Sequence, residues 1–361
     1  MQPNNNYVAI MAGGMGTRFW PQSRENMPKQ FLDILGTGQS LLQSTYQRFS
    51  QLVPEENIYI VTNIDYIDLV QQQLPTAKPH QIIGEPARRN TAPCVAYMAH
   101  KLRNLNPNAT FIVAPSDHHI IDEQNFQEIL QKALSFATNN DVLLTLGIQP
   151  NIPHTGYGYI QFDEEIQQDG VYKVKTFTEK PDLALARQFL ESGDFLWNSG
   201  LFIWNANTII EAFEKYAPKI NECFEDGSHS YNTANESKFI ANAYSQTISK
   251  SIDYAVMEYA DNVYVLPANF GWNDIGTWYS LWNLLPHDTL ENASLNHNAF
   301  FNHTNNSFVV APKKKLVVAV DLDGYCIVDT DDVLLICKIQ DDEKFREIYH
   351  NVQQKNGKKY L

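Results

Sequence analysis

Short apolar runs alternate with helical patterns along roughly the first two-thirds of the chain, and this alternation limits the fold more than any other feature. Runs typical of buried strands cover residues 7–11, 57–62, 109–115 and 142–148. Helical patterns cover residues 40–52, 90–102 and 125–137. Apolar strands that alternate with amphipathic helices predict a mostly parallel sheet with helices on both faces. The predicted fold class is therefore α/β.

The pattern changes twice further along the chain. From about residue 152, strand-like runs at 156–162 and 171–181 mix with helical patterns at 182–193, 207–217 and 237–248. Beyond about residue 290, short β-rich runs follow at 307–312, 315–322, 325–330 and 333–339, separated by Gly, Asp and Asn turns. We predict one large domain at residues 1–289, with parts at about 1–150 and 151–289, and a small β-rich, β-helix-like unit at 290–361. The polar segment 287–306 is interpreted as a linker.

The charge and the cysteines of the chain restrict its partners. The formal net charge is -14 at pH 7, which argues against a nucleic-acid-binding surface because such surfaces are basic. Positive charge for a phosphate ligand must therefore be local or come from a metal ion. The four cysteines form no CxxC pair, the first residues show no signal-peptide pattern, and no run of about 18 apolar residues occurs. We expect a cytoplasmic protein that does not span a membrane.

A glycine-rich stretch directly follows the first apolar run. Residues 11–31 read MAGGMGTRFWPQSRENMPKQF, with Gly13, Gly14 and Gly16 ahead of two arginines and a lysine. Backbone without Cβ atoms, at the carboxyl end of a parallel strand, can approach a phosphate or a base closely. No GK[ST] closes the stretch, and Phe19 stands where dinucleotide-binding loops carry a third glycine, which disfavours P-loop NTPases and common dehydrogenases. A tight turn is the alternative interpretation, but the basic residues favour a nucleotide site.

The same stretch resembles the signature of the sugar-nucleotide pyrophosphorylases, GGxGTR followed by PK. Its form RFWPQSRENMPKQF is similar to that of the mannose-1-phosphate guanylyltransferase branch. Further segments resemble this branch in the same order, namely GEPARRNTAP, VAPSDHHI, PHTGYGYI, FTEKP, WNSGLFIW and FGWNDIGTW. As a set these motifs are highly specific, and they cover nearly the first 290 residues. The resemblance implies a Rossmann-like, GT-A-like nucleotidyltransferase fold, with a nucleotide-binding part followed by a sugar-binding part.

The reaction that this resemblance implies is nucleotidyl transfer. The phosphate of mannose 1-phosphate attacks the α-phosphorus of GTP, which gives GDP-mannose and pyrophosphate. Because the nucleophile is already an anion, the protein has to align two anions and neutralise the leaving charge. The resemblance assigns the nucleotide to Ala12, Gly13, Gly14, Gly16 and Thr17, the base to Glu85, Pro86, Arg88, Asn90 and Thr91, and the phosphates to the catalytic residues Arg18 and Lys29.

The sugar is assigned by resemblance to the segments after residue 151. Gly156 and Gly158 would offer backbone groups to its hydroxyls, and Glu179 would accept hydrogen bonds from them. Asn198 offers both a donor and an acceptor, and Lys180 is expected on the sugar phosphate as the third catalytic residue. Taken alone, a Glu-Lys dipeptide at a strand end is more commonly a solvated pair.

A metal ion is expected because two anionic substrates repel each other. Asp117 follows an apolar strand, and Asp274 lies in the WNDIG segment. The resemblance implies that these two carboxylates bind Mg²⁺, a hard cation that prefers oxygen ligands. His118 and His119 lack companions for a zinc site and are interpreted as local structure.

Three alternatives remain open at this point. The same chemistry could use another sugar or another base, or the chain could be a non-catalytic subunit that binds GDP-mannose and reports its level. A glycosyltransferase would use a DxD motif, but the DLD string at residues 321–323 lies in the β-rich tail and is interpreted as a turn. No HxH-type metal set follows, so mannose 6-phosphate isomerase activity is not predicted. A homodimer is left open, with GTP, mannose 1-phosphate, GDP-mannose and pyrophosphate as the expected ligands.

Overall fold

The computed structural model describes residues 5–295, 298–339 and 342–361. Its contacts divide the chain into two compact units, each built from several segments. The first unit comprises Met1–Gly13, Tyr46–Ser116 and Ile120–Trp272, and the second comprises Gly14–Thr45, Asp117–His119 and Asn273–Leu361. Within the described residues, no helix has the length and apolar character needed to cross a membrane.

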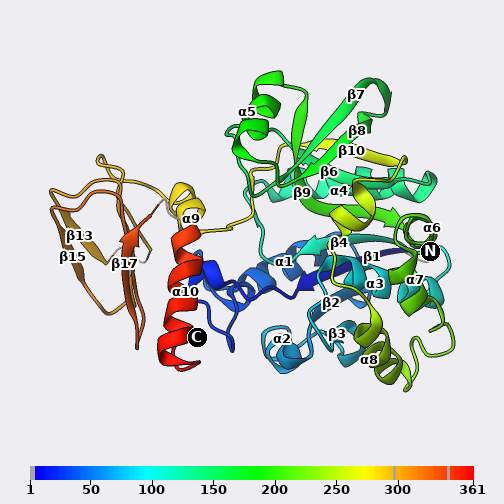
Figure 1. The fold of residues 1–361 in the computed structure, drawn as a ribbon, viewed down its shortest axis with the longest axis horizontal. Coiled ribbons are helices and arrows are strands. Elements are labelled where there is room, and N and C mark those ends of the chain that lie inside the picture. The colour runs from blue at the N-terminus through cyan, green and yellow to red at the C-terminus, as the bar shows by residue number, and fades with distance from the viewer. Residues whose placement is uncertain (1–4, 296–297, 340–341) are drawn as a thin grey trace. The chain divides into compact units, whose positions relative to one another are not determined.

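A nine-stranded sheet forms the centre of the first unit, in the order β3-β2-β1-β4-β9-β6-β10-β8-β7 (Figure 1). Its strands are β1 (Asn6–Ala12), β2 (Ile58–Asn63), β3 (Ile82–Glu85), β4 (Thr110–Pro115), β6 (Leu143–Ile148), β7 (Gly158–Gln168), β8 (Val171–Glu179), β9 (Phe195–Asn205) and β10 (Val263–Ala268). β1 pairs in parallel with β2 and β4, β2 with β3, and β6 with β10. The carboxyl ends of β1, β3 and β4 carry the segments with the predicted nucleotide and metal residues.

β9 separates the two parallel groups, because it runs antiparallel to both β4 and β6. β7 and β8 add further antiparallel pairs at one edge of the sheet. The residues of β2 are all buried, and those of β1 and β4 nearly all, as strands covered on both faces require. The predicted α/β class is confirmed, and the sheet is mixed where β9, β8 and β7 join it.

Helices cover both faces of this sheet. α3 (Thr91–Leu105) packs against α6 (Ala206–Tyr216) and α7 (Pro218–Glu225), and α8 (Glu236–Gln246) packs on α7 and β3. α4 (Glu123–Asn139) packs against β4, β6 and β9. Side chains cap several of these helices at their first turn: Asp122 accepts a hydrogen bond from the Asn125 N–H at the start of α4. The chain also forms α1 (Leu41–Ser50), α2 (Ile67–Gln73), α5 (Leu183–Ser192), η3 (Glu55–Asn57), η4 (Ile64–Tyr66), η5 (Pro79–Gln81) and the π-helical turn η6 (Asp253–Met257).

The second unit contains two small sheets of short strands. β12 (Ala293–Leu295), β14 (Phe308–Val310), β16 (Tyr325–Asp329) and β17 (Leu334–Lys338) form one, and β13 (Ala299–Asn302) and β15 (Val317–Val320) form the other. Successive strands stack in parallel, β12 on β14 on β16 and β13 on β15. This stacking is the arrangement of a β-helix, so the predicted β-rich character is confirmed. The unit also holds η1 (Thr17–Phe19), η2 (Lys29–Phe31), α9 (Trp278–Leu284) and α10 (Asp342–Asn356).

Aromatic side chains tie the glycine-rich segment into the core of the second unit. The ring of Phe19 lies 4.7 Å from that of Trp278, and Trp278 lies 6.2 Å from Phe308. All three side chains are fully buried. The indole N–H of Trp20 donates to the carbonyl of Tyr360 at 2.7 Å. The glycine-rich segment, which carries the basic residues, is therefore packed into the hydrophobic core of the second unit.

Two details of the second unit differ from the sequence analysis. The linker prediction for residues 287–306 is wrong in its described part, because β12 and β13 form within that segment; residues 296–297 lie outside the described residues. α10 was not predicted. The domain boundary at residue 290 stays a prediction. β5 (His119–Ile120) and β11 (Trp272–Asn273) complete the strands.

Candidate active site

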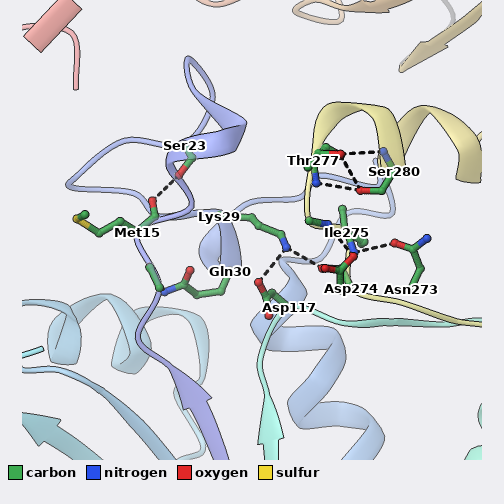
Figure 2. Close-up of polar contacts among 12 residues, drawn as sticks. Met15, Ser23, Lys29, Gln30, Asp117, Asn273, Asp274, Ile275, Thr277 and Ser280 are labelled. Atoms are coloured by element: carbon green, nitrogen blue, oxygen red, sulfur yellow. Dashed lines mark hydrogen bonds and ion pairs between the residues drawn. The ribbon is translucent and has the colours of Figure 1, made fainter. Parts of the chain in front are cut away.

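Lys29 is the centre of a polar network in the second unit (Figure 2). Its ammonium donates to Asp117 Oδ2 at 2.8 Å and to the backbone carbonyl of Asp274 at 3.0 Å. The Lys29 side chain is only 6% exposed, whereas that of Asp117 is 35% exposed. Lys29 begins η2, and Asp117 follows the end of β4. The structure thus brings together one residue predicted for phosphate and two predicted for metal.

Asp117 is held as an anion in this network. Burial alone would raise the pKa of its carboxyl group, but the Lys29 ammonium and His118 outweigh burial. The pKa of Asp117 is therefore lower than usual. An ionised carboxylate with part of its surface exposed is a suitable ligand for a hard divalent cation.

The Asp274 turn is locally constrained. Asn273 Oδ1 accepts from the Ile275 N–H at 2.7 Å, and Asp274 Oδ1 accepts from the Gly276 N–H at 3.0 Å. Ile275 has φ 42°, a conformation that is rare for a β-branched residue and indicates backbone strain. The turn is the element that directs the Asp274 carbonyl toward Lys29. The role of the Asp274 carboxylate as a metal ligand stays a prediction.

Gly16 is required where it stands. Its φ is 62°, and a Cβ atom there would lie 2.5 Å from Lys29 Cβ and 2.8 Å from Ser23 Oγ. Ser23 Oγ donates to the Met15 carbonyl at 2.9 Å, and Gln30 Nε2 donates to the Gly14 carbonyl at 3.0 Å. The glycine-rich loop is therefore fixed against the η2 segment that carries Lys29 (Figure 2).

The other residues predicted for the loop have less defined surroundings. At Gly14 a Cβ would meet nothing within 4 Å, which leaves its backbone accessible. Thr17 and Arg18 lie half-buried in η1, and their roles stay predictions. Arg24, the second arginine of the glycine-rich stretch, is structural: its guanidinium contacts Asp332 at 2.6 Å and the Pro21 carbonyl at 2.6 Å.

In the first unit, Glu85 ends β3 beside the start of the glycine-rich loop. A Cβ at Gly13 would lie 3.7 Å from Glu85 Oε2, and Ala12 before it is buried. Glu85 Oε1 accepts from the Tyr244 hydroxyl at 2.7 Å. Burial raises the pKa of Glu85 to about 7, although the hydrogen bond from Tyr244 opposes the shift. The carboxyl group predicted for the base therefore titrates near neutral pH.

The rest of the predicted base segment follows Glu85. Asn90 has φ 65° and ψ -170°, a region that is nearly restricted to glycine, and its side chain accepts from the Thr91 N–H. Such strain is concentrated at ligand-binding positions, so it supports the role predicted for Asn90. Thr91 Oγ1 accepts from the Ile252 N–H at 2.9 Å, and the Arg88 guanidinium donates to the Tyr66 hydroxyl at 2.8 Å. Pro86, which directly follows Glu85, is half-buried.

Three of the residues predicted for the sugar are neighbours across strands of the first unit. Gly158 on β7 lies opposite Glu179 on β8, and Tyr159, the next residue, lies opposite Trp197 on β9. A Cβ at Gly158 would stand 2.5 Å from Glu179 Oε2 and 3.2 Å from Asn198 Cβ. Any larger residue would therefore push the other two apart. Gly158, Glu179 and Asn198 form a cluster, as the sequence analysis expects.

Lys180 and Gly156 lie next to this cluster. The Lys180 ammonium pairs with the Glu179 carboxylate. Lys180 has φ 50°, which is unusual for a residue with a side chain and is a further strained position in a predicted site, after Ile275 and Asn90. The Gly156 N–H donates to His154 Nδ1 at 3.1 Å, and a Cβ at Gly156 would lie 2.8 Å from His154 Cε1.

The sequence did not identify the residues that hydrogen-bond to Asn198 and Glu179 in this cluster. Thr145 on β6 and Asp253 in η6 both contact the Asn198 side chain at 3.0 Å. Glu258 Oε1 accepts from the Glu179 N–H at 3.3 Å. None of these residues belongs to a motif that suggested a ligand. In the sequence, Asp253 and Glu258 flank the apolar run 254–257, and such a pair is only a weak signal for a site.

The metal prediction fits the chemistry of the donors. Asp117 and Asp274 supply oxygen atoms, which Mg²⁺ prefers. Across the three described ranges there is no group of three or more His, Cys, Asp and Glu side chains poised for a metal. A cation held by two carboxylates would need phosphate oxygens or water for its other positions, which is usual for Mg²⁺ in phosphoryl-transfer sites.

Comparison with known proteins agrees with this geometry. The family model described as nucleotidyl transferase matches residues 7–291. A mannose-1-phosphate guanylyltransferase of Salmonella muenchen is 36% identical over 362 residues, which cover 98% of this chain and 75% of that protein. The mannose-1-phosphate guanylyltransferase of Escherichia coli K12 is 36% identical over 358 residues, which cover 94% and 73%.

A solved structure extends the similarity to nearly the whole chain. It is the crystal structure of a mannose-1-phosphate geranyltransferase, as it is described, from Thermus thermophilus. It has a TM-score of 0.86 at 30% identity and covers 97% of this chain and 100% of that one. The match therefore includes the β-rich second unit as well as the large sheet. Together with the family model, it shows that the chain belongs to the nucleotidyl transferase family and is similar, within it, to mannose-1-phosphate guanylyltransferases.

Proposed function

We propose that this enzyme transfers GMP from GTP to mannose 1-phosphate, with GDP-mannose and pyrophosphate as products. The similarity to guanylyltransferases over 94% to 98% of the chain supports the substrates. The observation that supports the chemistry best is the buried Lys29 ammonium between the Asp117 carboxylate and the Asp274 carbonyl. A fixed cation beside an ionised carboxylate is what the transfer of a charged nucleotidyl group requires.

The second unit would act on the phosphates. Gly14, Gly16 and Thr17 present backbone in the loop that is fixed against η2, and Gly14 has open space beside it. Lys29 would stabilise the charge of the transferring phosphate, and Arg18 the charge of the leaving pyrophosphate. Because the attacking phosphate is an anion, no side chain has to remove a proton from it.

Members of this family generally use a divalent metal ion. We propose Mg²⁺, held by Asp117 and Asp274, because both offer hard oxygen ligands and Asp117 is kept ionised. A bound Mg²⁺ neutralises phosphate charge as a Lewis acid. Asp117 and Asp274 would hold the ion, and the Lys29 ammonium beside them would meet a phosphate oxygen.

The first unit would select the base and the sugar. The base is assigned to Glu85, Pro86, Arg88, Asn90 and Thr91, with Ala12 and Gly13 at the end of β1. Mannose 1-phosphate is assigned to Gly156, Gly158, Glu179, Lys180 and Asn198. The strained backbone at Asn90 and Lys180 and the close approach at Gly158 support these assignments. A cytoplasmic location is also proposed, because the four cysteines, all within the described residues, form no disulfide, and a homodimer stays open.

The experiment that tests the function is pyrophosphate release by the purified protein with Mg²⁺. GTP, ATP, dTTP, UTP and CTP are each paired with mannose 1-phosphate and with glucose 1-phosphate. Release with GTP and mannose 1-phosphate alone is expected. Release with another pair would correct the base or the sugar and keep the chemistry. No release with any pair would refute the proposed enzymatic activity. GDP-mannose binding would then favour a non-catalytic regulatory subunit.

A further inference from the structure

Asp253 is a half-buried acid that the proposed reaction does not use. It begins η6, and its Oδ1 accepts from Asn198 Nδ2 at 3.0 Å. Burial and the neighbouring Glu179 raise the pKa of Asp253 to about 7, which Lys180 and Ser251 oppose. Removing a carboxyl group from water costs free energy, so its presence at this position indicates a structural or functional role. π-Helical turns such as η6 are rare and frequently occur at functional sites.

The amide of Asn198 has only one orientation that satisfies its neighbours. The Gly200 N–H lies 3.1 Å from the Asn198 side chain and can only donate, so the atom that faces it is Oδ1. The Thr145 hydroxyl also lies 3.0 Å from Oδ1, although it shares its proton with the Leu201 carbonyl. The opposite atom, Nδ2, therefore faces Asp253.

This orientation changes what Asn198 can offer to a sugar. The Oδ1 atom is turned toward protein donors, whereas Nδ2 donates one of its two N–H groups to Asp253 and keeps the other. The sequence analysis gave Asn198 both roles, donor and acceptor. The structure limits it to the donor role.

Asn198 Nδ2 and the Glu179 carboxylate both lie close to Gly158. A Cβ at Gly158 would lie 3.6 Å from Asn198 Nδ2 and 2.5 Å from Glu179 Oε2. Because not even a Cβ fits there, Gly158 is what allows one donor and one acceptor to lie side by side. A sugar hydroxyl, or two neighbouring hydroxyls, can satisfy both because each hydroxyl donates once and accepts up to twice.

We propose that Asp253 is a positioning residue that fixes Asn198 as a hydrogen-bond donor, so that Asn198 and Glu179 bind sugar hydroxyls beside Gly158 as a donor–acceptor pair. The proposal rests on the proposed function and adds a determinant of sugar specificity to it. Residues of the same helical turn also hold Glu179. Glu258 Oε1 accepts its N–H, and the Tyr254 hydroxyl donates to its carbonyl at 3.4 Å. The segment 253–258 thus holds both partners of the pair.

Three variants separate this role from a plain structural one. Asp253→Leu removes the acceptor for Nδ2 while it keeps a side chain of similar size. Asp253→Asn keeps an acceptor oxygen and removes only the charge. Asp261→Leu is the control, since that carboxylate is exposed and pairs with Lys215 on the surface. Thermal unfolding identifies any variant that is not folded, and Asp253→Asn keeps the test decisive if Asp253→Leu does not fold.

The measurement is kcat/KM for mannose 1-phosphate and for its 2-, 3-, 4- and 6-deoxy analogues, together with KM for GTP. The wild-type protein is expected to discriminate against at least one analogue by about tenfold, the effect of one hydrogen bond. Asp253→Leu is expected to lose that discrimination and to keep the KM for GTP. Asp253→Asn and Asp261→Leu are expected to retain both.

The remaining outcomes contradict either the positioning role of Asp253 or the proposed function. Discrimination that survives in Asp253→Leu, or is lost equally in the Asp261→Leu control, would overturn the positioning role. If Asp253→Leu does not fold, loss of discrimination in Asp253→Asn would overturn it, because that variant keeps the acceptor. A wild-type protein that releases no pyrophosphate with mannose 1-phosphate would instead refute the proposed function, so the two failures are distinguishable.

Discussion

The ammonium of Lys29 lies 2.8 Å from the carboxylate of Asp117. Each side chain compensates the charge of the other, and both are predicted to act on phosphates, Lys29 directly and Asp117 through a metal ion. Their pairing keeps Asp117 ionised, since it is the Lys29 charge that offsets the effect of burial. The same contact therefore keeps the predicted metal ligand ionised and holds the ammonium that is predicted to bind phosphate.

Replacing Lys29 by Ala should abolish most turnover. The variant loses the fixed charge that stabilises the transferring phosphate, which costs several kcal/mol and lowers kcat by about 10²-fold or more. Pyrophosphate release under saturating GTP and mannose 1-phosphate measures the effect. Lys314→Ala removes an exposed lysine of the same unit and should turn over normally. Near-normal kcat in a folded Lys29→Ala protein would exclude Lys29 from the site.

Asp274→Asn should reduce turnover without loss of stability. The amide keeps an oxygen that can accept from the Gly276 N–H, and the backbone carbonyl still accepts from Lys29, so the turn survives. What disappears is one anionic ligand for Mg²⁺. A titration of activity with Mg²⁺ should show a higher half-saturating concentration and a kcat lower by about 10²-fold. Asp331→Asn, an exposed carboxylate in the same unit, is the control, and an unchanged Mg²⁺ dependence in Asp274→Asn would contradict the assignment.

Gly16 and Gly38 provide a matched pair of glycine substitutions. Both have positive φ, 62° and 87°, so alanine costs backbone strain of about 1 kcal/mol at each. Only at Gly16 would the new Cβ also overlap neighbours, at 2.5 Å from Lys29 Cβ, whereas Gly38 has nothing within 4 Å. Gly16→Ala should therefore lower the free energy of unfolding by about 1–3 kcal/mol more than Gly38→Ala. Denaturant unfolding measures the difference.

Activity should separate these two variants further. A displaced Lys29 backbone moves the ammonium away from its partners, so Gly16→Ala should lose turnover even where it is folded. Gly38→Ala should turn over at the wild-type rate. Equal stability and equal kcat in the two variants would mean that the loop does not position Lys29.

The sequence predicted most of the large sheet because its signal is local. β1, β2, β4 and β6 are short apolar runs between helical patterns, and the structure confirms each of them. β9 was not predicted as a strand, since WNSGLFIW was interpreted only as a motif. Its place between β4 and β6 depends on pairing with strands that are distant in sequence. Nothing in its own residues specifies those partners.

The site was predicted in part for the same reason. The motifs identified residues with recognisable chemistry, such as Lys29, Asp117 and Glu179, and their geometry supports the roles assigned to them. Asp253 lies in a π-helical turn and meets Asn198 only through the fold, 55 positions away in the chain. A partner that acts by holding another side chain has no motif of its own, and only the structure reveals it.

The pH dependence of stability should report the protonation of Glu85. Its carboxyl group releases a proton near pH 4.5 in the unfolded chain and near pH 7 in the folded protein. Between these values the folded protein binds more protons, so the free energy of unfolding falls as the pH rises. Glu85→Gln cannot titrate, and its amide oxygen can still accept from the Tyr244 hydroxyl.

Wild type should therefore lose about 1–3 kcal/mol relative to Glu85→Gln between pH 4.5 and pH 7.5. Urea unfolding across this range measures the difference. Asp253, whose pKa is also raised, is present in both proteins, so its contribution cancels. Glu191→Gln, at an exposed position, should follow the wild-type profile. Parallel profiles for wild type and Glu85→Gln would show that Glu85 is ionised at neutral pH, and the base would then meet a carboxylate rather than a carboxylic acid.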